Sequence, residues 1–88
     1  MRIHCFVSGT VQGVFFRDYT VGSAKENNVF GWVKNLSDGR VEIVAEGSPV
    51  NLIKFISLIK KGPKKAKVGE IEMAEETETG KFKSFERK

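Results

Sequence analysis

The 88-residue sequence is poor in the residues that build cross-links and metal sites. It contains a single cysteine, Cys5, and a single histidine, His4. One cysteine excludes an internal disulfide, which agrees with a reducing compartment, and one cysteine with one histidine cannot supply the several ligands of a zinc site. We therefore expect no bound metal and a structural role for both residues.

Long apolar runs are also missing. No stretch approaches the roughly 20 residues needed to span a bilayer, and the first residues lack the apolar segment of a secretory signal. A composition of 40% hydrophobic and 30% charged residues is typical of neither disordered nor membrane proteins. We expect a cytoplasmic protein with no membrane partner, folded as a single domain over residues 1–88, since a chain of this length buries only about 60–65% of its unfolded surface.

What the sequence does have is a glycine-bracketed loop at residues 7–17, VSGTVQGVFFR. Gly9 and Gly13 allow the backbone to turn and to approach a ligand closely, and a helix starting after the loop would offer unpaired N–H groups with a partial positive charge. Arg17 adds a full charge whose planar fork donates two hydrogen bonds to one phosphate. The segment is typical of an anion cradle.

A second unusual run, GWVKNLSDGRVE, occupies residues 31–42. It reads as a strand ending at Asn35, a turn at Asp38 and Gly39, and another strand. Taken singly, each run has a purely structural explanation. A glycine loop before an arginine is more often a turn than a phosphate site, and Asn35 alone would more often form a turn at the end of a strand.

Hydrophobic periodicity predicts the remaining elements. Residues 2–8 alternate as a half-buried strand, with Ile3, Cys5 and Val7 on one face. A helix is predicted over residues 16–27 on the thin stripe of Phe16, Thr20 and Ala24. The sequence signals for the second helix are stronger. Ser48 is a plausible N-cap, Pro49 takes the first helical position, apolar residues recur at helical spacing, and the helix stops at residues 62–63. The apolar positions of this helix are Leu52, Phe55, Ile56 and Ile59.

Strands are predicted at residues 29–36, 40–46, 67–75 and 81–87. The resulting βαββαβ order with a terminal strand predicts an α+β, ferredoxin-like sandwich, in which an antiparallel sheet carries both helices on one face.

Together the two motifs resemble those of the acylphosphatase family, V-x-G-x-V-Q-G-V-x-F-R followed by G-[WY]-V-x-N-x-x-D-G-x-V, and both halves match at the family's spacing. Residues 46–47 and 62–63 extend the likeness over nearly the whole chain. The resemblance implies the same ferredoxin-like fold. It also implies metal-free and cofactor-free hydrolysis of an acyl phosphate to a carboxylate and inorganic phosphate.

The resemblance also implies the site residues. Arg17 would bind the phosphoryl oxygens and Asn35 would orient the attacking water. Because the amide of Asn35 cannot remove a proton from water, the phosphate of the substrate is the expected proton acceptor. The expected phosphate-binding loop comprises Gln12, Gly13, Val14, Phe15, Phe16 and Arg17.

The departures from the family pattern concern the first helix and not the site. Asn27 stands where the family usually has leucine, Asn28 stands where it usually has glycine, and Gly22 costs about 1 kcal/mol relative to alanine within a helix. We expect a marginal helix that depends on docking. The aromatic residues Phe6, Phe15, Phe16 and Trp32 are expected to serve in packing.

Two other functions stay open. The first is a non-catalytic module that holds an anion or RNA, although residues 40–46 lack the aromatic and basic motif of RNA-binding sheets. The second is a domain of a larger carbamoyl-transfer protein, against which the short chain argues. The run KKGPKKAK at residues 60–67 would attract polyanions, yet lysines near helix ends are usually solvated. We expect a monomer that binds acyl phosphate and inorganic phosphate and no nucleic acid.

Overall fold

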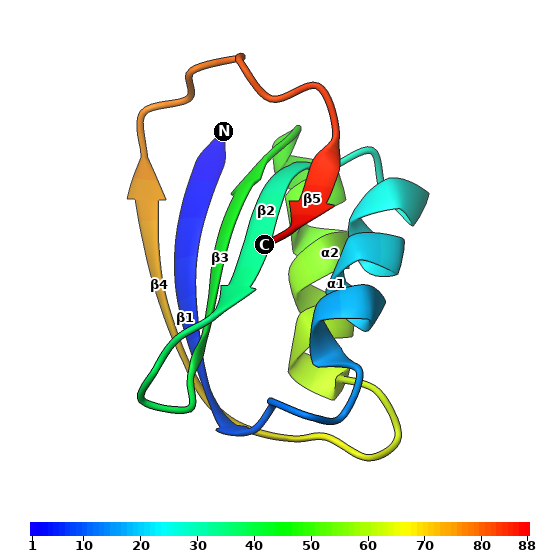
Figure 1. Cartoon of the computed structure of the whole chain (residues 1–88). Coiled ribbons are helices and arrows are strands. Elements are labelled where there is room, and N and C mark those ends of the chain that lie inside the picture. Colours follow the sequence, from blue (N-terminus) through cyan, green and yellow to red (C-terminus); the bar gives the residue numbers. More distant parts are fainter.

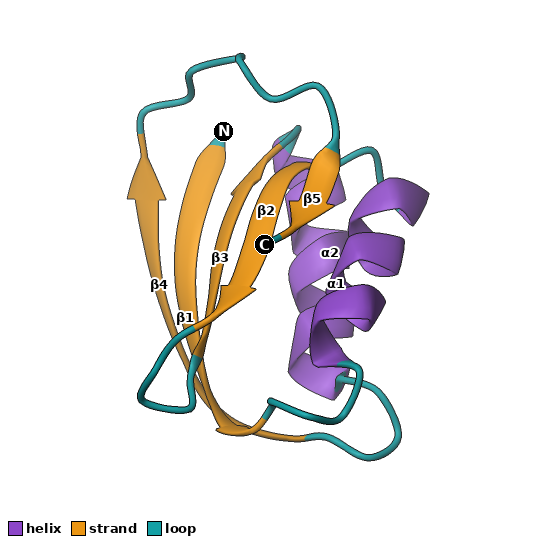
Figure 2. Cartoon of the chain, viewed as in Figure 1, coloured by secondary structure: helices purple, strands orange, loops and turns teal.

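The computed structural model describes residues 1–88 as one sheet with two helices (Figures 1 and 2). The predicted order of elements is confirmed, and the last strand is shorter than the predicted 81–87. The elements are β1 (Arg2–Thr10), α1 (Phe16–Glu26), β2 (Phe30–Asn35), β3 (Val41–Glu46), α2 (Pro49–Lys61), β4 (Lys67–Glu76) and β5 (Phe85–Arg87). Neither helix is long and apolar enough to cross a membrane.

The strands lie in the order β4-β1-β3-β2-β5, which is the ferredoxin-like arrangement with one strand added. Four strands pair antiparallel, as predicted, but β5 runs parallel to β2. The predicted antiparallel arrangement is therefore confirmed for β1 to β4, whereas β5 makes the sheet mixed. The reason is the connection over residues 77–84, which crosses from the last residue of β4 to the other edge of the sheet (Figure 1). Because β2 starts at the same end of the molecule, β5 begins beside the start of β2 and runs in the same direction.

The direction of the strands defines two ends of the molecule. β1 and β2 both run toward the end at which α1 begins, α2 finishes and β4 starts, and we call this the loop end (Figure 1). The opposite end, where β3 and β4 finish, is the far end. Residues of the two sequence motifs therefore converge at the loop end.

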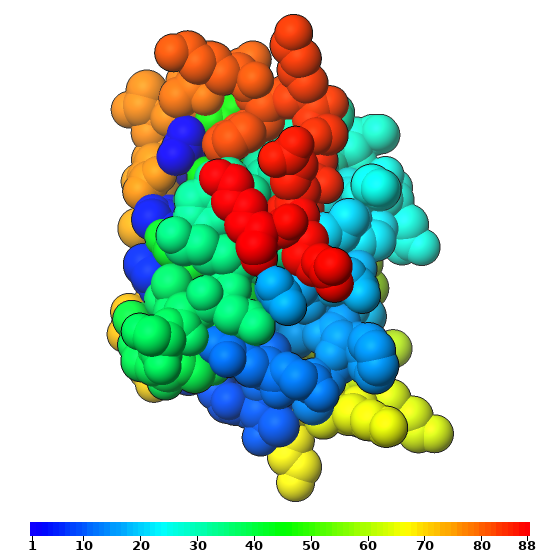
Figure 3. All heavy atoms as spheres, in the orientation of Figure 1, coloured from blue at the N-terminus to red at the C-terminus, as the bar shows by residue number.

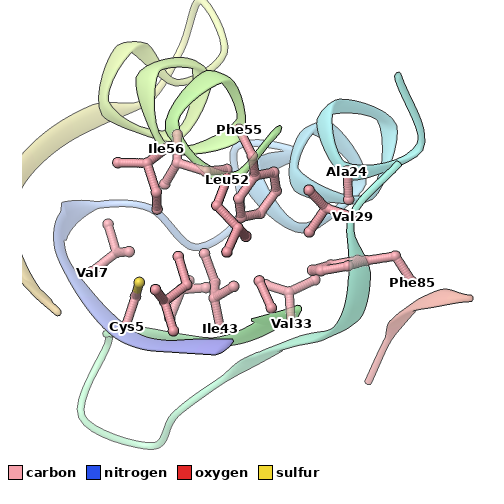
Figure 4. Close-up of a cluster of buried hydrophobic side chains, with 14 of the residues drawn as sticks. Cys5, Val7, Ala24, Val29, Val33, Ile43, Leu52, Phe55, Ile56 and Phe85 are labelled. Carbon is pink, nitrogen blue, oxygen red and sulfur yellow. The ribbon is translucent and has the colours of Figure 1, made fainter. Parts of the chain in front are cut away.

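The core lies between the sheet and the helices, which cover one face (Figure 4). The predicted inward face of β1 is confirmed, because Ile3, Cys5 and Val7 are buried. Burial of apolar side chains supplies most of the stabilisation of such a domain. The labelled core residues come from the strands (Cys5, Val7, Val33, Ile43, Phe85), from the residue before β2 (Val29), from α1 (Ala24) and from α2 (Leu52, Phe55, Ile56).

Helix α2 begins as the sequence predicts. The Ser48 hydroxyl accepts a hydrogen bond from the Asn51 N–H at 3.1 Å, and Pro49 occupies the first turn, where its missing N–H costs nothing. At the other end, Gly62 adopts φ 68°, a left-handed conformation that stops the helix.

Helix α1 tolerates buried polar residues because each hydroxyl bonds to the preceding turn. Thr20 Oγ1 donates to the Phe16 carbonyl and Ser23 Oγ to the Tyr19 carbonyl, both at 2.8 Å. Asn27, one of the departures from the family pattern, donates its amide to the Ser23 carbonyl at 2.9 Å and so caps the helix. These bonds satisfy the buried groups of a helix with a thin apolar stripe.

Docking fixes α1 against its neighbour. The Tyr19 hydroxyl donates to the Leu58 carbonyl of α2 at 2.8 Å. The chain then leaves α1 through Asn28 at φ 52°, a left-handed conformation that asparagine tolerates better than most residues other than glycine. The start of α1 is thereby held in place beside the sheet.

A buried carboxylate fastens the crossing connection at the far end. Glu46 is 4% exposed and accepts hydrogen bonds at 3.0 Å from the N–H and hydroxyl of Thr79 and from the N–H of Gly80, with Arg2 Nη1 at 3.4 Å. Burial alone raises the pKa of Glu46, but the hydrogen bonds from Thr79, Gly80 and Arg2 outweigh it and hold this pKa below its ordinary value.

We expect Glu46→Gln to lower the free energy of unfolding at pH 7 by about 1–3 kcal/mol, because a charged acceptor of several hydrogen bonds is lost. A depressed folded pKa stabilises the protein above the unfolded pKa of about 4.3, and this contribution disappears as the pH falls through the folded value. Urea unfolding at several pH values measures it, with the exposed Glu75→Gln as the control. An equal loss at pH 7 and pH 3 would contradict the charge-based account.

Candidate active site

The loop that joins β1 to α1 has an unusual backbone. Gly13 and Phe15 adopt φ values of 72° and 64°, and Val14 between them has no positive φ. Such alternation turns successive N–H groups toward one side and forms a concave anion-binding nest. A left-handed conformation in a bulky residue such as Phe15 is strained, and such strain is concentrated at functional sites.

The amides of this loop are unpaired. None of the N–H groups of residues 13–18 donates a hydrogen bond within the chain, and the first helical bond runs from Tyr19 N to the Phe15 carbonyl at 3.0 Å. Phe15, the residue that precedes the helix, provides no side-chain cap. The free donors and the positive pole of α1 therefore favour an anion at this place.

Arg17 lies in the first turn of α1 and is half-buried. Its Nη1 donates to the carbonyl oxygen of Lys88 at 2.9 Å, which holds the guanidinium across the end of β5. The guanidinium has five N–H donors, so the others stay available to a ligand.

Asn35 is the last residue of β2 and opens into the same cavity as Arg17. Its side chain is exposed and forms no hydrogen bond with another part of the chain, which leaves the amide free to orient a water molecule. The cavity measures about 270 Å³ and is lined by Val11, Gly13, Phe15, Phe16, Arg17, Asp18, Asn35 and Arg87.

Two predicted loop residues do not line the cavity. Gln12 directs its side-chain amide away, and its Nε2 donates to the carbonyls of Leu36 and Arg40 at 2.8 Å each. Val14 packs against the core. Gln12 therefore ties the loop to the hairpin that follows Asn35, which fixes the position of the two motifs relative to each other.

Phe15 corrects one expectation of the sequence analysis. It was expected to serve in packing, but its side chain is 73% exposed at the rim of the cavity. The left-handed backbone of Phe15 turns the side chain outward, whereas the neighbouring Phe16 is buried, as predicted. Phe6 and Trp32 are half-buried on the sheet face that the helices do not cover.

Comparison with known proteins bears on this arrangement. The family model described as acylphosphatase matches residues 3–87. The chain belongs to the acylphosphatase family.

Individual members of the family match closely. The sequence is 52% identical over 81 residues to an acylphosphatase of Chloroflexus aurantiacus, which covers 92% of this chain and 88% of that one. The crystal structure of acylphosphatase from Bacillus subtilis superposes with a TM-score of 0.92 at 38% identity, covering 96% and 93% of the two chains. An acylphosphatase from Coxiella burnetii gives 0.91 at 39% identity, covering 99% and 90%.

The structure of this acylphosphatase family member adds three cavity residues that the sequence did not indicate. Arg87 of β5 and Asp18 of α1 form an ion pair at 2.9 Å on the rim, and Val11 lines the floor. Arg87 and Asp18 are 69 positions apart, so no local pattern signals the pair. The parallel pairing of β5 with β2 places Arg87 opposite Val33, two residues before Asn35, and both Arg87 and Asn35 line the cavity.

The remaining candidates for proton transfer or metal binding lie elsewhere. Cys5 is buried in the core, where desolvation raises the pKa of its thiol to about 12. No three His, Cys, Asp or Glu side chains are grouped so that they could hold a metal ion. Arg17, Arg87 and the unpaired amides are the positively charged or hydrogen-bond-donating groups around the cavity.

His4 lies on the open face of the sheet and does not line the cavity. Its Nδ1 is 2.7 Å from Glu76 Oε2 and its Nε2 is 2.6 Å from Glu42 Oε2. Burial lowers the pKa of His4, but the hydrogen bonds and charges of Glu76 and Glu42 outweigh it, and the net result is a raised pKa. When the ring is protonated, both of its N–H groups donate to carboxylates and it links β1 to β3 and β4.

We expect His4→Gln to destabilise the protein by about 1 kcal/mol at pH 5.5, where the ring is charged in both folded and unfolded states. A raised folded pKa stabilises fully below the unfolded value of about 6.5, and this contribution disappears as the pH rises through the folded value. Urea unfolding across pH 5–9 measures the effect. If a fall in kcat near pH 6.5 in the wild type vanished in the variant, His4 would have a role in the reaction instead.

Proposed function

We propose that this chain hydrolyses the carboxyl–phosphate bond of acyl phosphates to a carboxylate and inorganic phosphate, without a metal ion or cofactor. The observation that carries the proposal is the cavity in which unpaired amides of residues 13–18, the Arg17 guanidinium and the Asn35 amide meet. Membership of the acylphosphatase family supports it.

In this mechanism the phosphoryl group lies in the nest at residues 13–17. The amides and Arg17 neutralise its oxygens, and this electrostatic work is most of what phosphoryl transfer requires of a protein. Arg17 thereby takes the part that Mg²⁺ plays in many phosphoryl-transfer sites. Its contact with the Lys88 carbonyl orients the fork before substrate arrives.

Asn35 holds the attacking water in line with the bond that breaks. The water oxygen bonds to phosphorus, the bond from phosphorus to the acyl oxygen breaks, and the carboxylate leaves with the electron pair. Because Asn35 cannot accept the proton as a base, the proton passes to a phosphoryl oxygen of the substrate. A carboxylate is a stable leaving group, so no general acid is required.

The simplest test is hydrolysis of acetyl phosphate by the purified chain. We expect activity to persist in excess chelator, inorganic phosphate to compete with substrate, and an alkyl phosphate to react at least about 100-fold more slowly, because no acid protonates its leaving group. Loss of activity on chelation, restored by a metal ion, would refute the metal-free mechanism. If the chain bound phosphate but hydrolysed no acyl phosphate, it would be a binding module.

We also propose that the chain works as a cytoplasmic monomer that binds acyl phosphate and inorganic phosphate. The buried thiol of Cys5 fits a reducing compartment. The exposed edge strand β4 carries charged side chains, and these oppose pairing with the edge of another molecule. The charged residues of β4 are Lys67, Glu70, Glu72, Glu75 and Glu76.

A further inference from the structure

The lysine-rich run of the sequence forms the connection from α2 to β4. We call residues 60–67 the lysine segment, which contains five lysines and no acidic residue. All five side chains are exposed, and none takes part in a salt bridge. The lysines are Lys60, Lys61, Lys64, Lys65 and Lys67.

This segment lies against the loop that holds the free amides. At its end, Lys67 pairs with Thr10 of β1, and a Cβ added at Gly9 would stand 2.2 Å from the Lys67 carbonyl oxygen. At its start, a Cβ at Gly62 would lie 3.7 Å from the ring of Phe16, which lines the cavity. Figures 1 and 3 show the yellow segment beside the blue loop, projecting past it at the loop end.

Acidic residues offset only a small part of this charge at the loop end, where Glu70 of β4 is exposed and forms no salt bridge. Asp18 is paired with Arg87 at 2.9 Å, and Asp38 with Arg40 at 2.8 Å. Most other carboxylates stand toward the far end, where three elements finish on acidic residues. These are Glu26 of α1, Glu46 of β3, and Glu75 and Glu76 of β4.

Helix capping accounts for only part of the segment. Lys60 and Lys61 lie in the last turn of α2, where cations stabilise the negative pole of the helix. Lys64, Lys65 and Lys67 follow the helix and have neither this role nor an acidic partner. Three adjacent cations that repel one another are thus unexplained by the fold.

We propose that the lysine segment is an electrostatic collecting surface for the cavity, and that it favours acyl phosphates whose acyl group carries an additional negative charge. The proposal rests on the proposed function of the cavity. A field from the segment attracts anions before contact and raises their local concentration beside the free amides. The attraction grows with the charge of the ligand, so a carboxylated acyl phosphate gains more than acetyl phosphate.

The test reverses charge at the two lysines of the exposed turn, Lys64→Glu with Lys65→Glu. At low ionic strength we expect kcat/KM to fall about 10-fold for succinyl phosphate and about 3-fold for acetyl phosphate, within the range of electrostatic rate effects. The effect lies in KM, and kcat stays unchanged, because these side chains do not line the cavity. In about 1 M salt, where the Debye length is about 3 Å, the difference from wild type disappears.

The matched control is Lys81→Glu with Lys83→Glu, which changes net charge equally on the far-end connection. We expect its kcat/KM to stay within about twofold of wild type in the same low-salt buffer, since Lys81 and Lys83 lie at the far end and the Coulomb energy falls with distance. Equal losses in both variants would assign the effect to net charge, and no loss in the Lys64/Lys65 variant would remove the segment from substrate capture. Either result overturns the proposal.

Calorimetric titration with inorganic phosphate separates this inference from the proposed function. The Lys64/Lys65 variant should bind phosphate about 3-fold more weakly than wild type at low salt, whether or not the chain hydrolyses acyl phosphates. If wild type bound phosphate without hydrolysing an acyl phosphate, the enzymatic proposal would fail. The role of the lysine segment would still be tested, by comparing the phosphate affinity of the Lys64/Lys65 variant with that of wild type. Unchanged phosphate affinity and unchanged KM in the folded variant would refute the collecting surface.

Discussion

Arg17→Lys is expected to lower kcat/KM for an acyl phosphate by about 100- to 1,000-fold, the size of effect seen when one preorganised donor to a reacting oxyanion is lost. Lysine keeps the charge but not the planar fork, so it cannot donate two aligned bonds to the phosphoryl oxygens. It also cannot hold the Lys88 carbonyl and a ligand in the geometry that Arg17 allows. Both phosphate affinity and turnover therefore fall.

Kinetics with acetyl phosphate and calorimetry with inorganic phosphate measure this pair of effects. The matched control is Arg40→Lys, because Arg40 is bound to Asp38 and does not line the cavity. We expect the control to retain both phosphate binding and turnover. An Arg17→Lys protein with unchanged phosphate affinity would show that the guanidinium does not contact the phosphoryl group.

Asn35→Ala is expected to lower kcat by about 100-fold or more and to leave phosphate affinity within about twofold of wild type. The residue stands at the end of β2 and lines the same cavity as the loop that holds the free amides, and its side chain has no partner in the chain. The Asn35→Ala variant therefore no longer orients the attacking water, whereas its contacts with phosphate remain. Asn35→Ala thus lowers kcat without lowering phosphate affinity, whereas Arg17→Lys lowers both.

Single-turnover kinetics and phosphate titration measure the separation, with circular dichroism as a check of folding. Asn51→Ala on α2 is the control, since it removes the same amide far from the cavity. An Asn35→Ala protein that turns over like wild type would remove Asn35 from the mechanism. Equal losses of binding and turnover would give it a phosphate-binding role instead.

The sequence predicts the features of the molecule that depend on local pattern. Alternation placed Ile3, Cys5 and Val7 on the inward face of β1, and the Ser48 cap with the Gly62 stop gave α2 its bounds. These signals operate within a few residues, where steric and hydrogen-bonding preferences decide the outcome. The two site motifs were visible for the same reason, since each is contiguous along the chain.

Features that depend on distant partners were not predicted. The parallel direction of β5 follows from the crossing connection, and the Arg87–Asp18 pair follows from β5. The outward side chain of Phe15 depends on a strained backbone conformation that its residue type disfavours. The positioning role of Gln12 likewise required the hairpin carbonyls to be in place.

Binding of the phosphoryl group by the free amides of residues 13–18 together with Arg17 is the central claim of the proposed mechanism. Amide-resolved NMR during titration with inorganic phosphate tests this claim directly. We expect the largest chemical-shift changes at the backbone amides of residues 13–18, at Arg17 Nε and at the Asn35 side-chain amide, with saturation at one affinity. Changes confined to the lysine segment or to the far end, with these amides unmoved, would contradict it.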